Sequence, residues 1–123
     1  MTPVTKFWAT LIGGGVVLLL RNSTVFAVKP GVILESKPEM EYARRLIARV
    51  WESRGFNLTI TSGVDGRHSA QSKHYAGLAE DYRTRDVPVL AVSQMADEIR
   101  AVLGRDYDVV IESDHLHVEY DPK

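Results

Sequence analysis

The stretch DVVIESDHLHVEY, residues 108–120, predicts a β-hairpin near the C-terminal end of the chain. Residues 109–111 are all β-branched, and residues 115–120 alternate polar and apolar side chains, as strands do. Between them lie Ser113 and Asp114, which are typical turn residues. The sequence therefore predicts two adjacent antiparallel strands joined by a short turn.

The second of these strands carries two histidines, His115 and His117. Residues two apart on a strand point to the same face, so both imidazoles address one space. Two imidazoles on one face are unusual for packing alone, and they suit zinc, which favours nitrogen and oxygen donors. The hairpin is therefore a candidate source of metal ligands.

A second candidate pair is His74 and Asp81, seven residues apart. A helix would place them roughly 10 Å apart along its axis, and a strand would separate them further. They can share an ion only if the chain folds back between them, and Gly77 is a residue that tolerates such a bend. In the strand that follows, Asp81 and Arg83 share one face, and Glu80 is expected on the opposite, solvated face.

The first helix is expected to begin near Ser36, with Pro38 in its first turn. Ser36 and Glu39 form the S-x-x-E pattern of a capping box, and Gly55 is the expected end of the helix. The apolar residues with helical spacing, which should face the core, are Met40, Ala43, Leu46, Ile47, Val50 and Trp51.

Further elements follow without a regular β-α-β repeat. We expect strands over residues 56–61 and 78–83, a polar loop between them, and a second helix over residues 88–103 that ends at Gly104. The predicted class is α+β, with a small, mainly antiparallel sheet and flanking helices.

The composition excludes several classes of function. The chain has 123 residues, a net charge of -1 and no basic run, so it has no electrostatic bias toward nucleic acid, and we expect no nucleic-acid partner. Cysteine is absent, so disulfides, cysteine catalysis and thiolate metal sites are excluded. Any metal must be held by histidine and carboxylate side chains.

The N-terminal segment differs from the rest of the chain. Residues 7–20 carry no charge, and Val25-Phe26-Ala27 follows shortly after. The run is shorter than the roughly 20 residues of a spanning helix, and it fits a signal peptide cleaved after Ala27. Two alternatives are a retained membrane anchor and a buried element of the fold. We expect residues 1–27 to be a signal peptide or anchor, 28–36 a linker, and 37–123 the folded domain.

Two separated motifs, S-x-H-x-x-G-x-A-x-D at residues 72–81 and D-H-x-H at residues 114–117, occur in that domain. Together they resemble the motifs of zinc D-alanyl-D-alanine carboxypeptidases and of phage endolysins, including L-alanyl-D-glutamate peptidases. These enzymes cut peptidoglycan peptides and share their fold with the Hedgehog signalling domain. The resemblance covers roughly residues 37–123.

The resemblance implies a role for each matching residue. His74, Asp81 and His117 would hold one zinc ion per chain, and Asp114 would be the general base. The usual arginine of the family has no clean match here. The candidates for oxyanion stabilisation, substrate contact or support of the ligands are Arg67, His68, Gln71, Ser72 and His115.

The register of the second motif leaves one alternative. In an unbroken strand Asp114 and His117 would point to opposite faces, so their shared role requires Asp114 to precede the strand. Glu112 and His115 have the same three-residue spacing and form the rival pair. The D-H-x-H match favours Asp114 with His117.

The expected function is hydrolysis of peptidoglycan stem peptides by a monomeric zinc peptidase exported to the periplasm or cell envelope. Membrane contact, if any, would come only through an uncleaved N-terminal segment. The alternatives are a phage-type endolysin that cuts an internal bond, a non-catalytic zinc-stabilised binding domain, and a domain whose histidines are incidental.

Overall fold

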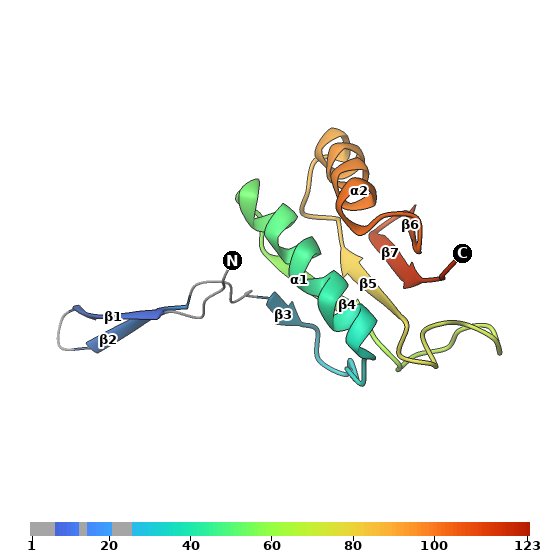
Figure 1. The fold of residues 1–123 in the computed structure, drawn as a ribbon, viewed down its shortest axis with the longest axis horizontal. Coiled ribbons are helices and arrows are strands. Elements are labelled where there is room, and N and C mark those ends of the chain that lie inside the picture. The colour runs from blue at the N-terminus through green and yellow to red at the C-terminus, as the bar shows by residue number, and fades with distance from the viewer. Residues whose placement is uncertain (1–6, 13–14, 21–25) are drawn as a thin grey trace.

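The computed structural model describes residues 7–12, 15–20 and 26–123 (Figure 1). Its main element is a five-stranded sheet with the strand order β3-β4-β5-β7-β6. The strands are β3 (Phe26–Val28), β4 (Leu58–Ser62), β5 (Ala79–Arg83), β6 (Tyr107–Ile111) and β7 (His115–Tyr120). The β3–β4 pairing is parallel and the other three are antiparallel, so the sheet is mixed and mainly antiparallel. The predicted α+β class is confirmed.

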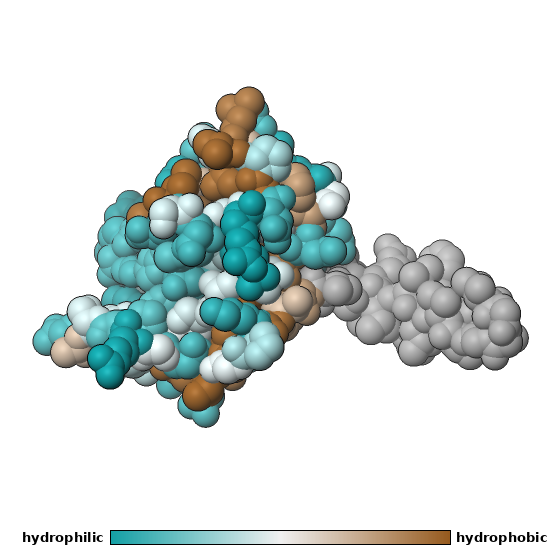
Figure 2. Space-filling view, turned by 180° about the vertical axis from the view of Figure 1, so that it is seen from behind, coloured by the Kyte–Doolittle hydropathy of each residue, from teal (hydrophilic) through white to brown (hydrophobic). Residues whose placement is uncertain are grey.

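Two helices pack their apolar side chains against one face of the sheet. They are α1 (Pro38–Ser53) and α2 (Val89–Leu103). Their buried side chains form a single core with those of the strands, in which the Trp51 ring of α1 lies 6.3 Å from the Tyr82 ring of β5. The view from behind is mostly hydrophilic, with apolar side chains at the end where α2 lies and a smaller group at the opposite end (Figure 2). The core therefore lies between the helices and one face of the sheet.

The end of α1 is set by its sequence. Gly55, at φ +80°, follows the helix, and its N–H donates to the carbonyl of Glu52 while the N–H of Phe56 donates to that of Trp51. This pair of bonds is the Schellman motif, in which a residue without a Cβ adopts the left-handed conformation. The predicted helix end is confirmed.

The start of α1 differs from the prediction. The residue before the helix is Lys37, and no side chain caps the first turn. The Ser36 hydroxyl instead donates to Glu80, and Arg44 Nη2 donates to Ser36 Oγ at 2.9 Å. In a capping box the Ser36 oxygen would accept a backbone N–H of the first turn, whereas here it accepts from Arg44, so Ser36 joins the Glu80 network instead.

Glu80 is fully buried, so the prediction of a solvated Glu80 is wrong. It lies on the face of β5 that α1 covers, where Arg44 donates to it through Nη2 at 2.5 Å and Nε at 3.0 Å. The Tyr82 hydroxyl donates to the same carboxylate at 2.9 Å. The buried charge is therefore paired and hydrogen-bonded on several sides.

The N-terminal part of the described chain adds further strands. β1 (Phe7–Ile12) and β2 (Gly15–Leu20) form a separate two-stranded antiparallel sheet. β3 contains Ala27, so the sheet extends across the expected cleavage point. No helix among the described residues has the length and apolar character needed to cross a membrane.

Residues 28–36, the expected linker, contact the strands and the loop after β4. The N–H of Lys29 donates to the carbonyl of Ile60, and the N–H of Ile33 donates to the Asp65 carboxylate. Val32 and Leu34 pack against the core. The segment is therefore bonded to the sheet and packed against the core.

The buried Arg44–Glu80 pair gives the first prediction. Arg44→Met should leave the Glu80 carboxylate without its cation and lower the free energy of unfolding by about 3–5 kcal/mol. Arg45→Met is the control, because Arg45 is the next residue on α1 and is exposed; its effect should stay within about 0.5 kcal/mol. Urea unfolding followed by circular dichroism measures both, and equal effects would contradict this account of Glu80.

Candidate metal centre

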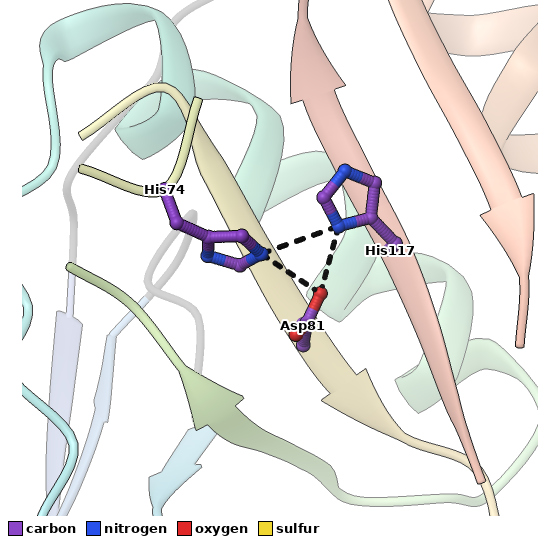
Figure 3. Close-up of side chains that lie close together, drawn as sticks. All are labelled: His74, Asp81 and His117. Atoms are coloured by element: carbon purple, nitrogen blue, oxygen red, sulfur yellow. Dashed lines mark hydrogen bonds and ion pairs between the residues drawn. The ribbon is translucent and has the colours of Figure 1, made fainter. Parts of the chain in front are cut away.

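Three side chains from separate segments converge on the open face of the sheet (Figure 3). His117 Nδ1 lies 2.9 Å from Asp81 Oδ1, His74 Nε2 lies 3.3 Å from the same oxygen, and the two nitrogens lie 3.3 Å apart. His74 and Asp81 are buried and His117 is half-buried. These three residues, the His/Asp cluster, could hold a metal ion.

Strand register places two members of the cluster. Asp81 of β5 and His117 of β7 are direct partners across the antiparallel pair, so their side chains leave the sheet side by side. The neighbours Glu80 and Leu116 point to the opposite, helix-covered face because side chains alternate along a strand. The sheet thus fixes the Asp81–His117 contact.

The third member, His74, arrives through a fold in the chain. Gly77 has φ +73°, and a Cβ added there would lie 2.5 Å from the Glu35 carbonyl oxygen, so only glycine fits. The N–H of Gly77 donates to the His74 carbonyl at 3.1 Å and closes the turn. The expected bend between His74 and Asp81 is confirmed.

Backbone groups also fix the ring of His74. Its Nδ1 lies 2.8 Å from the carbonyl oxygen of Gly63, directly after β4, and the Ser72 hydroxyl accepts the His74 N–H at 3.1 Å. A carbonyl only accepts, so Nδ1 carries a proton, and in the neutral ring the Nε2 lone pair points at the cluster. Metal-ligating histidines are commonly oriented by such a carbonyl contact.

His117 is held from both sides of its ring. Nδ1 faces Asp81, and Nε2 lies 2.8 Å from Glu119 Oε1 on the same strand face. The hydrogen bond to Asp81 raises the pKa of His117 to about 9, against burial, which lowers it. Glu119 adds to this rise. If Nε2 donates its proton to Glu119, the Nδ1 lone pair is available to a metal.

Asp81 is ionised despite its burial. Burial raises the pKa of its carboxyl, but the interactions with His117 and His74 outweigh it and hold the pKa well below its usual value. A carboxylate and two imidazoles without cysteine form a nitrogen and oxygen donor set, which suits zinc.

Two of the three spacings between the donor atoms match those around a tetrahedral ion, and the third is shorter. Zinc bonds of about 2.0–2.1 Å at tetrahedral angles place ligand atoms roughly 3.3–3.4 Å apart. Two of the three distances are 3.3 Å and the third is 2.9 Å. In addition, His74 Nε2 and Asp81 Oδ1 are two acceptors facing each other when His74 is neutral, and a cation between them would stabilise that contact.

His68 lies behind His74 and is not among the converging donors. The two rings stack with centroids 4.0 Å apart and planes 7° from parallel. Its Nε2 is 2.9 Å from the Asp65 carbonyl and 3.2 Å from Ser62 Oγ, so its contacts are with these groups. His68 thus supports the ring of a candidate ligand.

Asp114 and His115 lie beside the cluster. Asp114 falls in the turn before β7, as its proposed role requires, and its carboxylate is exposed. His115 Nδ1 lies 2.8 Å from Asp114 Oδ1, and this bond, against a small effect of burial, lowers the pKa of Asp114. His115 Nε2 is 3.7 Å from Asp81 Oδ2. The converging set therefore contains His117 rather than His115.

The remaining candidates do not contact the cluster. Arg67 and Gln71 are exposed on the loop between β4 and β5, and among the described residues neither side chain bonds to His74, Asp81 or His117. The Gly63 carbonyl was missed by sequence reasoning, since a backbone acceptor leaves no signature in side-chain patterns.

Comparisons with protein-family models, with curated proteins and with solved structures found no match to this chain.

Proposed function

We propose that this chain is a zinc-dependent metallopeptidase of the Hedgehog/DD-peptidase fold that hydrolyses a bond in peptidoglycan stem peptides. The observation that carries the proposal is the convergence of His74, Asp81 and His117, with the His74 ring oriented by the Gly63 carbonyl. The substrate class is supported by the two sequence motifs. The uncharged N-terminal run supports export to the cell envelope, where such peptides lie.

His74 Nε2, Asp81 Oδ1 and His117 Nδ1 would hold the ion, leaving a fourth position for water or substrate. When bound, zinc lowers the pKa of water and polarises a carbonyl group. The three protein ligands carry one negative charge between them, from Asp81, when both imidazoles are neutral.

Asp114 is the proposed general base. Its carboxylate lines a cavity together with Asp81, although the hydrogen bond from His115 lowers its pKa and so makes it a weaker base. Asp114 takes the proton of the attacking water and delivers it to the leaving amine. His115 orients the carboxylate through the 2.8 Å contact with Oδ1.

The ligand set gives a binding prediction. His74→Ala, Asp81→Ala and His117→Ala should each weaken zinc binding more than Glu119→Ala, which removes a supporting contact and should cost roughly 10–100-fold. His115→Ala is the matched histidine control and should keep one zinc per chain. Isothermal titration calorimetry measures the zinc affinity of each variant, and metal analysis measures the number of zinc ions per chain. Unchanged affinity in the three ligand variants, or an equal loss in His115→Ala, would reject the ligand set.

Zinc affinity should also depend on pH. With a pKa of about 9 in the metal-free protein, His117 is protonated at neutral pH, and zinc must displace that proton. The apparent affinity should therefore rise by up to about tenfold per pH unit between about pH 6 and about pH 8. Competition with a chelator of known affinity measures it, and a flat profile over this range would contradict proton displacement at His117.

The base is tested separately from the ligands. Asp114→Ala should keep the fold and bound zinc but lose roughly 10²–10⁴-fold in the rate of muropeptide hydrolysis. Glu112→Ala is the control, because Glu112 lies on the far side of the turn and does not line the cavity shared by Asp114 and Asp81. Mass spectrometry of digested muropeptides measures both rates.

Three outcomes of that experiment would change the proposal. If hydrolysis is lost in Glu112→Ala and not in Asp114→Ala, Glu112 rather than Asp114 is the general base. An active enzyme unaffected by either change would reject this proton transfer. A zinc-loaded protein that hydrolyses no peptidoglycan peptide would favour the non-catalytic binding domain.

A further inference from the structure

Asp65, on the loop after β4, is a half-buried acid that binds backbone groups. Its Oδ1 accepts the N–H of Gly63 at 2.9 Å and the N–H of Ile33, 32 residues away in sequence, at 2.8 Å. Burial raises the pKa of the Asp65 carboxyl, but the bonds from Ile33 and Gly63 outweigh burial and hold the pKa below its usual value. One ionised oxygen therefore fastens the loop to the segment before α1.

Gly63 connects Asp65 to the His/Asp cluster. Its N–H donates to Asp65, and its carbonyl lies 2.8 Å from Nδ1 of His74. When both backbone groups of a residue are hydrogen-bonded, the direction of its carbonyl is restrained. A histidine ligand takes its ring orientation from the acceptor of its other nitrogen. The Asp65 carboxylate thus acts on His74 through a single residue.

His68 provides a second connection. Its Nε2 lies 2.9 Å from the carbonyl oxygen of Asp65, and its ring stacks on the ring of His74 with centroids 4.0 Å apart. The side chain of Asp65 therefore holds the acceptor of the His74 ring, and the main chain of Asp65 contacts the residue stacked on that ring.

The loop keeps another bond to the segment before α1 that does not involve the Asp65 side chain. The carbonyl of Ile33 accepts the N–H of Val64 at 2.9 Å. A Cβ on Gly63 would lie 2.3 Å from the Ile33 carbonyl oxygen, so the two backbones are in close contact. Loss of the Asp65 carboxylate should therefore loosen the Gly63 peptide group while the loop stays in place.

We infer that Asp65 is a positioning residue for zinc binding, because it fixes the Gly63 carbonyl that turns Nε2 of His74 toward the ion. This inference rests on the proposed function and deepens it, since it names a side chain outside the ligand set that controls the affinity of the site. A carboxylate suits this role because an ionised oxygen accepts N–H groups more strongly than a neutral one.

Zinc titration of the full chain tests the effect on affinity. Asp65→Ala removes the acceptor and should weaken zinc binding roughly tenfold, the lower end of the effect of groups that support metal ligands. Asp65→Asn keeps an oxygen that can accept both N–H groups, so it should bind zinc within roughly threefold of the native chain. Asp86→Ala is the matched control, because Asp86 is an exposed acid between β5 and α2; it should leave the affinity unchanged.

Two results of this titration would overturn the inference. Asp65→Asn as weak as Asp65→Ala would show that charge matters rather than a fixed acceptor. An equal loss in Asp86→Ala would show a general effect of removing an acid.

The Nδ1 proton of His74 reports positioning without any metal. Because it faces the Gly63 carbonyl and His74 is buried, this proton should exchange slowly with water in the metal-free native chain. In Asp65→Ala it should exchange at least roughly tenfold faster, while the backbone amides of β5 and β7 keep their rates. NMR of the ¹⁵N-labelled protein measures both. Unchanged exchange at His74, or equal acceleration in the strands, would overturn the inference.

The two measurements separate this inference from the proposed function. If the native chain binds no zinc and Asp65→Ala still speeds exchange at His74 alone, the metallopeptidase proposal fails and the control of His74 by Asp65 stands. If the native chain binds zinc and hydrolyses muropeptides, and Asp65→Ala changes neither affinity nor exchange, the inference fails and the metallopeptidase stands.

Discussion

The cross-strand contact between Asp81 and His117 is the interaction on which the rest of the site depends. Antiparallel register makes these residues direct partners, so their 2.9 Å contact is set by the backbone hydrogen bonds of β5 and β7 rather than by flexible side chains. His74 is then brought to this pair by the turn at Gly77 and held by the Gly63 carbonyl. A donor set held this way loses little freedom when it binds an ion.

β5 carries a buried acid on each of its faces. Glu80 points to the helices and Asp81 to the cluster, and both would be costly to bury as unpaired charges. Arg44, Ser36 and Tyr82 satisfy Glu80, whereas two imidazoles satisfy Asp81. The Glu80 network connects β5 to α1, and thereby holds the strand that presents Asp81 in a fixed position.

Local patterns predicted much of this fold. The alternation over residues 56–61, the helical stripe that ends at Gly55, and the hairpin around Asp114 each follow from propensity and spacing within a few residues. The bend at Gly77 was also predictable, because two candidate ligands seven residues apart can meet only if the chain folds back. These features share one property, namely that neighbours in sequence decide them.

Features decided by distant partners were not predictable. The alternation rule places Glu80 opposite Asp81, but it does not say that α1 covers that face and brings Arg44 to the carboxylate. Ser36 has the sequence of a helix cap, but its oxygen accepts from Arg44 and its hydroxyl donates to Glu80, 44 residues away. Likewise, the parallel pairing of β3 with β4 holds residues 28–36 against the sheet and brings Lys29 to the cavity that Asp81 lines.

The most direct test of the central claim is a crystal structure of the zinc-loaded protein with anomalous diffraction at the zinc edge. The account predicts one anomalous peak about 2.0–2.2 Å from His74 Nε2, Asp81 Oδ1 and His117 Nδ1, with the His74 Nδ1 contact to Gly63 retained. A peak at another group of residues would contradict it. So would a cluster that keeps its direct hydrogen bonds and holds no zinc in crystals grown with excess metal.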